Sequence, residues 1–134
     1  GFRPVIAIAI AMAAKKRILI VEDDEVNTRI LTKILTPAFD VVAVADGAQA
    51  LRALEKDPIP DLVIADVMMP NVDGLALVRT MKGHPRTKGV PVILVTAKSA
   101  PRDVIDGINA GARHYVTKPF RMEDILQKVK KILA

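Results

Sequence analysis

Short apolar runs recur along the chain from residue 17 onward, and each is followed by an amphipathic stretch. The runs are rich in Val, Ile and Leu and nearly free of polar residues. This pattern is typical of strands that are buried on both faces of a sheet. The five predicted strands cover 17–21, 41–45, 62–65, 90–95 and 114–116.

Apolar residues spaced three and four apart between these runs predict helices. The first such stretch has its apolar positions at Val26, Ile30, Leu31, Ile34 and Leu35. Asp24 is placed to cap the start of this helix, and Pro37 is expected to stop it. The five predicted helices cover 26–35, 48–56, 75–82, 102–110 and 122–133.

Five alternating strand–helix units predict one α/β domain with a parallel, doubly wound sheet and helices on both faces. Two strand orders suit such a sheet, and a length of 134 residues favours the five-stranded, flavodoxin-like order 2-1-3-4-5. In either order, ligands bind beyond the carboxyl ends of the strands. Functional polar residues should therefore follow strands rather than precede them.

Composition removes several classes of function. Cysteine is absent, which excludes disulfides, thiolate metal sites and thiol nucleophiles. The net charge of +5 is concentrated at the start, because four of the 20 basic residues precede Ile18 and leave 16 basic and 15 acidic residues after it. No basic stripe interleaved with aromatic residues occurs, so the domain is not expected to bind nucleic acid.

Polar residues do follow the predicted strands. Glu22 and Asp23 follow the first strand, Asp66 the third and Lys118 the fifth, while Thr96 ends the fourth. In the order 2-1-3-4-5 the first and third strands are neighbours, so the three acids converge, with Thr96 and Lys118 on the other side of Asp66. Each residue alone has an ordinary structural explanation, and the prediction of a site rests on all of them together.

Three converging carboxylates repel one another unless one keeps its proton or a cation joins them. Mg²⁺ fits, because it prefers oxygen ligands and needs only one or two carboxylates beside water and phosphate. A carboxylate beside Mg²⁺ and a lysine ammonium is placed to attack phosphorus, since both cations neutralise phosphoryl oxygens. Thr96 adds a hydroxyl donor at such a site.

Four segments carry a resemblance to a known family. They are ILIVEDD at 18–24, DLVIADVMMPNVDG at 61–74, VTA at 95–97 and YVTKPF at 115–120. Over residues 17–134 the chain resembles the CheY-like receiver domains of response regulators in two-component signalling. The resemblance implies a switch that is not an enzyme in the usual sense. A phosphoryl group would pass from a phosphohistidine of a histidine kinase or histidine phosphotransfer protein to Asp66, with Mg²⁺ as cofactor.

The same resemblance assigns the metal ligands. Asp23 and Asp66 would contact Mg²⁺ directly, and Glu22 would act through a metal-bound water. The backbone carbonyl of Met68 would complete the protein ligands.

A conformational switch is implied as well. Thr96 would close on the phosphoryl group, Lys118 would pair with it, and Pro119 would follow in a cis bond. Tyr115 would turn inward into the vacated space. The surface formed by the fourth helix, fifth strand and fifth helix, expected over 102–110, 114–116 and 122–133, would then bind a downstream protein or a second copy of the chain.

Two positions near the phosphoacceptor bear on the lifetime of the phosphorylated form. Met68 follows Asp66 by two residues, and Lys98 follows Thr96 by two. Neither an apolar thioether nor a cation accepts a proton from an attacking water. We therefore expect a long-lived aspartyl phosphate.

Three other functions fit parts of the pattern. A flavodoxin-type cofactor binder shares the strand order but needs a phosphate-binding loop where Glu22 and Asp23 stand. A phosphatase with an aspartyl nucleophile needs a second acid where Met68 stands. A receiver that serves only as an interaction module usually lacks one of the acids, the threonine or the lysine, all of which are present.

Residues 1–16 lie outside the predicted domain. Their apolar run at 5–14 is only half as long as the stretch of about 20 residues that spans a membrane. The run resembles a secretory signal, but export is set aside because the chemistry requires cytosolic phosphodonors, so a cytoplasmic location without membrane attachment is expected. Two interpretations of residues 1–16 are open. They are an upstream extension that results from the choice of start site, or an apolar segment that adds to a sheet edge or a dimer contact.

Overall fold

The computed structural model describes residues 3–6, 15–69, 71–97 and 101–134. Within these residues, five parallel strands form one sheet in the order β2-β1-β3-β4-β5. The strands are β1 (Arg17–Val21), β2 (Asp40–Val44), β3 (Leu62–Asp66), β4 (Val92–Thr96) and β5 (His114–Thr117). The predicted α/β class and strand order are confirmed.

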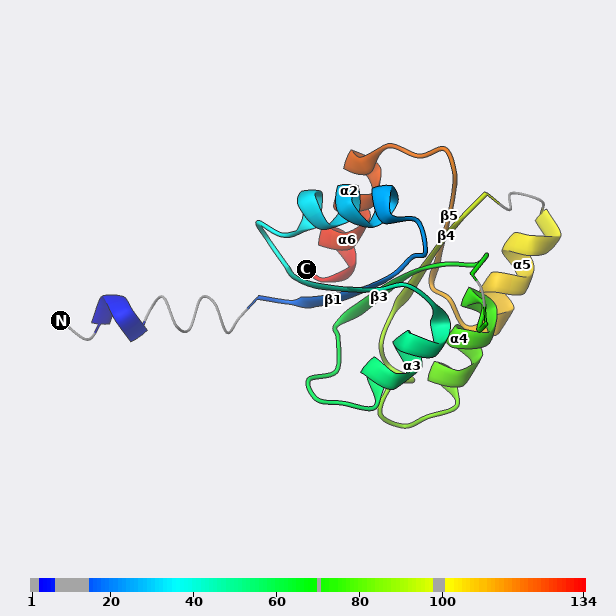
Figure 1. Cartoon of the computed structure of the whole chain (residues 1–134), viewed down its shortest axis with the longest axis horizontal. Helices are drawn as coiled ribbons and strands as arrows, with labels where there is room; N and C mark the ends of the chain where they lie inside the picture. Colours follow the sequence, from blue (N-terminus) through cyan, green and yellow to red (C-terminus); the bar gives the residue numbers. More distant parts are fainter. Residues whose placement is uncertain (1–2, 7–14, 70, 98–100) are drawn as a thin grey trace.

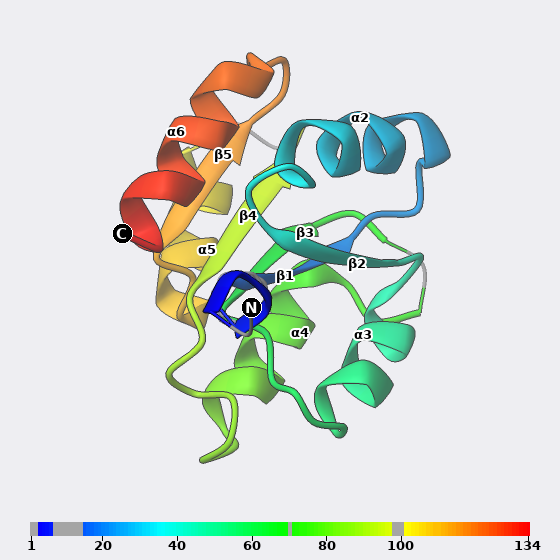
Figure 2. The ribbon, with the colours of Figure 1, turned by 90° about the vertical axis from the view of Figure 1, so that its left-hand side faces the viewer.

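Helices cover both faces of the sheet, with α2 and α6 on one face and α3, α4 and α5 on the other (Figures 1 and 2). Their bounds are α2 (Glu25–Leu35), α3 (Gly47–Leu54), α4 (Gly74–Lys82), α5 (Pro101–Ala110) and α6 (Met122–Ile132). Residues 3–6 form a further helical turn. Most of the apolar run at 5–14 lies outside the described residues, so both interpretations of the extension stay predictions.

Alternate residues of the central strands pack into two separate cores. Leu19, Val63 and Leu94 belong to the core shared with α3, α4 and α5. Ile18, Ile64 and Ile93 belong to the core shared with α2 and α6. The strands are apolar on both sides because each face is covered, as expected of a parallel sheet between two helical layers. This packing fixes the strand ends, where the polar residues lie.

The predicted start of one strand is wrong. The fourth strand was expected from residue 90, but β4 begins at Val92, since Pro91 has no N–H to donate and only its carbonyl accepts a hydrogen bond, from Val63. In α2, Val26 is 63% exposed and Ile30 is 38% exposed. The inward side of α2 is set by Leu31 and Leu35, which leaves the Val26–Ile30 stripe facing solvent.

The other element boundaries differ by one or two residues. The second strand begins and ends one residue earlier than predicted, and α3 begins one residue earlier and ends two residues earlier. No helix within the described residues has both the length and the apolar character needed to cross a membrane.

Candidate functional site

Three acids meet at the carboxyl ends of β1 and β3. Asp66 is the last residue of β3, and Glu22 and Asp23 follow β1, whose Val21 pairs with Ala65. Each of the three side chains offers one oxygen, and these oxygens lie within 4.8 Å of one another. Glu22 and Asp66 are buried while Asp23 is exposed, so the cluster opens to solvent on one side.

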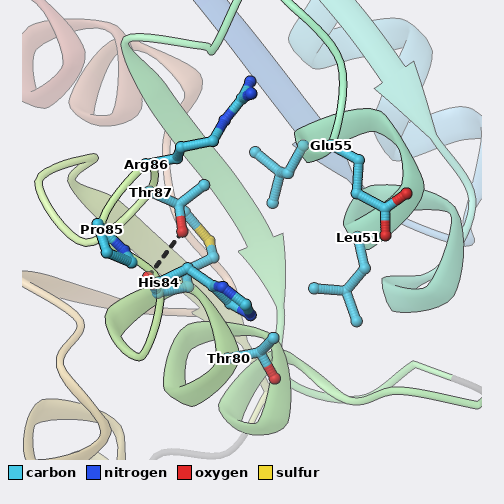
Figure 3. A pocket seen from close by; sticks show the side chains of 9 residues that line it. Leu51, Glu55, Thr80, His84, Pro85, Arg86 and Thr87 are labelled. Atoms are coloured by element: carbon cyan, nitrogen blue, oxygen red, sulfur yellow. Dashed lines mark hydrogen bonds between the residues drawn. The ribbon is translucent and has the colours of Figure 1, made fainter.

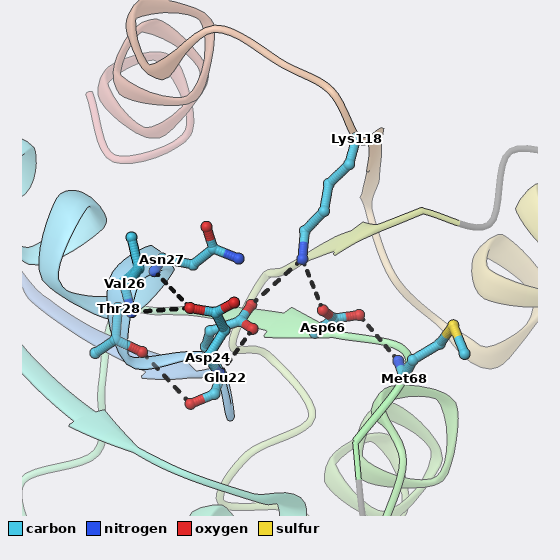
Figure 4. A network of polar contacts seen from close by, with 8 residues as sticks. All are labelled: Glu22, Asp24, Val26, Asn27, Thr28, Asp66, Met68 and Lys118. Carbon is cyan, nitrogen blue, oxygen red and sulfur yellow. Dashed lines mark hydrogen bonds and ion pairs between the residues drawn. The ribbon is translucent and has the colours of Figure 1, made fainter.

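Asp66 uses both carboxylate oxygens (Figure 4). Oδ2 accepts a hydrogen bond from Lys118 Nζ at 2.9 Å, and Oδ1 accepts one from the backbone N–H of Met68 at 2.9 Å. The carboxylate is therefore held in one orientation by a cation on one side and by its own following loop on the other.

Lys118 is positioned by the end of β4. Its backbone N–H donates to the carbonyl of Thr96 at 2.7 Å, and the peptide bond to Pro119 is cis, as expected. Its ammonium lies 3.7 Å from Glu22 Oε2 in addition to its contact with Asp66. Burial by itself would lower the pKa of Lys118, but the hydrogen bond and charge of Asp66, with the charges of Glu22 and Asp24, raise it. The lysine is cationic at this site.

The pKa of Glu22 is raised above its ordinary value. Burial raises the pKa of Glu22, and the charges of Asp66 and Asp23 raise it further, against the opposing effects of the Asp24 N–H and Lys118. Burial is the largest cause of this rise. Three carboxylate oxygens at this spacing are a suitable donor set for Mg²⁺.

Asp24 belongs to the helix rather than to the acid cluster. Its Oδ1 accepts hydrogen bonds from the N–H groups of Val26 and Asn27 at the start of α2 (Figure 4). Its own N–H donates to Glu22 Oε1 at 3.2 Å. The predicted N-cap is confirmed, and this cap also fixes the Glu22 carboxylate.

Thr96 and Tyr115 lie on β4 and β5, the two strands that follow β3 in the sheet. Thr96 is fully buried and follows Val95, the residue that pairs with Asp66. Tyr115 pairs with Leu94 and is half-buried. Burial raises the pKa of Tyr115, and the charges of Asp103 and Asp66 add to this effect. The switch roles expected of Thr96 and Tyr115 stay predictions.

Of the two residues expected to affect the lifetime of the phosphorylated form, the structure describes only one. The Met68 side chain is 58% exposed beside the phosphoacceptor loop. Lys98 lies outside the described residues.

A separate hollow of about 440 Å³ lies at the other end of the sheet, between α3, α4 and the loop before β4 (Figure 3). Leu51 and Met81 are among the apolar residues that line it, with His84 and Arg86 among the polar ones. Its position at the amino ends of the strands separates it from the acid cluster.

Comparison with known proteins decides the family. The sequence model of the response regulator receiver domain matches residues 18–130, nearly the whole of the chain. The chain belongs to the response-regulator receiver family. Receivers are phosphoacceptor switches with an acidic magnesium site, and here Glu22, Asp23 and Asp66 form that acidic site.

Relatives and solved structures agree with the receiver assignment. The chain is 37% identical over 117 residues to the DNA-binding response regulator MtrA of Mycolicibacterium smegmatis, covering 87% of this chain but only 50% of MtrA. The receiver domain of a signal transduction histidine kinase from Syntrophus aciditrophicus is 40% identical, with a TM-score of 0.81 and coverage of 88% and 89%. The receiver of the Pseudomonas aeruginosa kinase PA1611 is 30% identical (TM-score 0.80, coverage 90% and 100%) and has magnesium in its active-site cleft.

Sequence reasoning missed two glycines that shape this receiver. A Cβ on Gly107 of α5 would lie 2.7 Å from the Tyr115 ring, and a Cβ on Gly47 of α3 would lie 2.2 Å from the carbonyl oxygen of Val72. The available signal was the glycine inside the predicted helix 102–110, where glycine is unfavourable without a packing reason; Gly47 precedes the predicted helix 48–56 and gave no such signal.

Proposed function

We propose that Asp66 accepts a phosphoryl group from a phosphohistidine on a histidine kinase or histidine phosphotransfer protein. The observation that carries this proposal is the hydrogen bond of 2.9 Å between Asp66 Oδ2 and Lys118 Nζ, inside a cluster of three acids. A carboxylate oxygen held beside a cation is a suitable nucleophile for this transfer.

The transfer balances without any further reactant. An oxygen of Asp66 bonds to phosphorus as the P–N bond of the donor breaks. The electron pair of that bond returns to the imidazole nitrogen, and the ring leaves neutral because its other nitrogen carries a proton. Lys118 remains protonated and neutralises charge that gathers on the phosphoryl oxygens.

The proposed metal ligands are Asp23 and Asp66 directly, Glu22 through a water, and the backbone carbonyl of Met68. Mg²⁺, when bound, supplies positive charge that lowers the repulsion between the carboxylate and the phosphoryl oxygens. The chain contributes by holding the acids in place, since the sheet and the Asp24 cap fix Glu22 and the Met68 N–H orients Asp66.

The proposed output is a change in the α5–β5–α6 surface. Thr96 moves toward the phosphoryl group, and Tyr115 turns inward behind it. Two exposed apolar residues of α5, Ile105 and Ile108, each 55% exposed, lie on this surface and support a role in binding a downstream protein or a second copy of the chain.

We assign this activity to residues 17–134, acting in the cytoplasm without direct contact with nucleic acid or membrane. Residues 18–134 are nearly balanced in charge, which supports protein partners over nucleic acid.

Beryllofluoride, which mimics a phosphoryl group on a carboxylate, gives the test of these roles. The receiver of DrrB, 31% identical with a TM-score of 0.81, has been solved in a BeF3-activated form. We expect BeF₃⁻ with Mg²⁺ to shift the amide signals of Thr96, Tyr115 and Lys118 in wild type, and to shift none of them in Asp66→Asn. Equal shifts in both proteins would contradict the assignment of Asp66.

A further inference from the structure

The first turn of α3 presses against the loop that follows Asp66. Gly47 is buried, and a Cβ built on it would lie 2.2 Å from the carbonyl oxygen of Val72 and 2.7 Å from its Cβ. Real Cβ atoms do not approach other atoms this closely. Glycine is therefore what allows the helix start and this loop to touch.

Asp46 ties the same two segments together by hydrogen bonds. Its Oδ1 accepts from the N–H of Gln49 at 2.8 Å and caps α3, while its Oδ2 accepts from Asn71 Nδ2 at 3.3 Å. Asn71 has a φ of 68°, in the left-handed region that asparagine tolerates better than most residues. The carboxylate thus holds the loop where its backbone makes an unusual turn.

The two ends of the loop are joined to each other independently of α3. The N–H of Gly74 donates to the carbonyl of Val67 at 3.0 Å, and a Cβ on Gly74 would lie 2.5 Å from the carbonyl oxygen of Asp66. Met68 lies between this closure and the contact with α3, and its N–H donates to Asp66. The loop is therefore restrained where Gly74 meets Val67 and where Asn71 and Val72 meet α3.

We propose that Asp46 and Gly47 are positioning residues of the magnesium site. By holding Asn71 and Val72 they fix the backbone of the loop that contains Met68, whose carbonyl is one of the proposed metal ligands. Among the described residues, the Asp46 carboxylate bonds to Gln49 and Asn71 rather than to a group of the acid cluster, so its effect is placed on the loop. This inference rests on the proposed function, because it needs the Met68 carbonyl to bind Mg²⁺.

Gly47→Ala tests the steric contact, with Gly89→Ala as the matched control because a Cβ on Gly89 meets nothing within 4 Å. Mg²⁺ is titrated by NMR into each variant of the 134-residue chain, and thermal unfolding is measured in EDTA. We expect the Mg²⁺ affinity of Gly47→Ala to fall by about tenfold, as for loss of other outer-shell support, and that of Gly89→Ala to stay at the wild-type value. The Mg²⁺ concentration needed for half-maximal phosphorylation by acetyl phosphate should rise by the same factor.

Asp46→Ser and Asn71→Gly test the hydrogen bond without disturbing the fold. Serine keeps an N-cap oxygen for Gln49, and glycine keeps the left-handed backbone. Each variant is expected to weaken Mg²⁺ binding by about three- to fivefold, the worth of one hydrogen bond, and the double variant by no more than either single one.

Two results would overturn the inference. One is wild-type Mg²⁺ affinity in Gly47→Ala, Asp46→Ser and Asn71→Gly while wild type itself binds the ion, which leaves the proposed function standing. The other is failure of wild type to bind Mg²⁺ at all, which removes the proposed function as well. Asp46→Asn keeps both the cap and an oxygen that can accept from Asn71, so it should bind Mg²⁺ like wild type, whereas Asp46→Ser, which keeps the cap alone, should not.

Discussion

Lys118 Nζ lies 2.9 Å from Asp66 Oδ2 and 3.7 Å from Glu22 Oε2, so one ammonium serves two buried carboxylates that come from different strands. The contact joins β5 to β1 and β3 across the carboxyl edge of the sheet. It explains how the acids are tolerated side by side, while burial still raises the pKa of Glu22.

Lys118→Met should damage both chemistry and stability. Without the ammonium, only Mg²⁺ neutralises the charge on the phosphoryl group. We therefore expect phosphorylation by acetyl phosphate to slow by about 100-fold. The metal-free protein should lose about 1 to 2 kcal/mol, less than for a fully buried pair because the lysine side chain is 27% exposed. Stopped reactions resolved by intact mass, and urea unfolding, measure the two effects. A rate within about twofold of wild type would rule out the role given to Lys118.

Glu22→Gln should stabilise the protein in the absence of Mg²⁺ and should be stabilised less than wild type when Mg²⁺ is added. A carboxyl whose pKa is raised above its usual 4.5 by folding stabilises the protein below that pH, and this contribution is lost as the pH rises through the raised value. The neutral glutamine loses nothing, so the variant should unfold at a higher temperature than wild type at neutral pH in EDTA, with the two converging in acid. Addition of Mg²⁺ should raise the unfolding temperature of wild type by more than that of Glu22→Gln.

Thermal unfolding from acid to neutral pH, in EDTA and in Mg²⁺, measures the pH dependence and the effect of the metal. Parallel pH curves for the two proteins in EDTA would show that folding does not raise the pKa of Glu22.

Much of this architecture could be predicted from sequence, because buried strands leave a simple apolar signature and carboxyl ends of parallel strands meet at one edge. That rule brought Glu22 and Asp66 together although they are 44 residues apart. The cap formed by Asp24 was predictable for a similar reason, since its bonds are local.

What could not be predicted depends on packing between elements. Periodicity shows that α2 is amphipathic, but the side on which Leu31 contacts the sheet decides whether Ile30 is covered. The contacts of Gly47 with Val72 and of Gly107 with Tyr115 join separate elements, and no local pattern specifies them. The raised pKa of Glu22 likewise requires its burial to be known.

Gly107→Ala should displace the Tyr115 ring. The added Cβ would lie 2.7 and 2.8 Å from two ring carbons and 3.2 Å from Leu94 Cδ1. We expect a loss of about 1 to 3 kcal/mol from overpacking, with altered ring-proton shifts of Tyr115. In a Tyr115→Ala background the same change should cost nothing or add up to about 1 kcal/mol, since alanine favours helix over glycine.

A double-mutant cycle by urea unfolding gives the coupling between the two positions. Equal effects of Gly107→Ala in both backgrounds would mean that the glycine does not set the position of the ring.

Met68→Asn should shorten the lifetime of the phosphorylated form severalfold. The exposed thioether cannot orient an attacking water, whereas an amide can. Met68→Leu is the matched control and should keep the wild-type lifetime. Loss of the phosphorylated species is followed by intact mass after removal of the donor, and an unchanged or slower rate in Met68→Asn would count against the prediction.

The account depends most on Asp66 accepting phosphorus within a cluster of acids that shares one hard cation. Intact mass spectrometry after incubation with acetyl phosphate and Mg²⁺ tests this directly. Wild type should gain one labile adduct of about 80 Da, and neither Asp66→Asn nor wild type in EDTA should gain it. No adduct on wild type, or the same adduct on Asp66→Asn, would contradict the account.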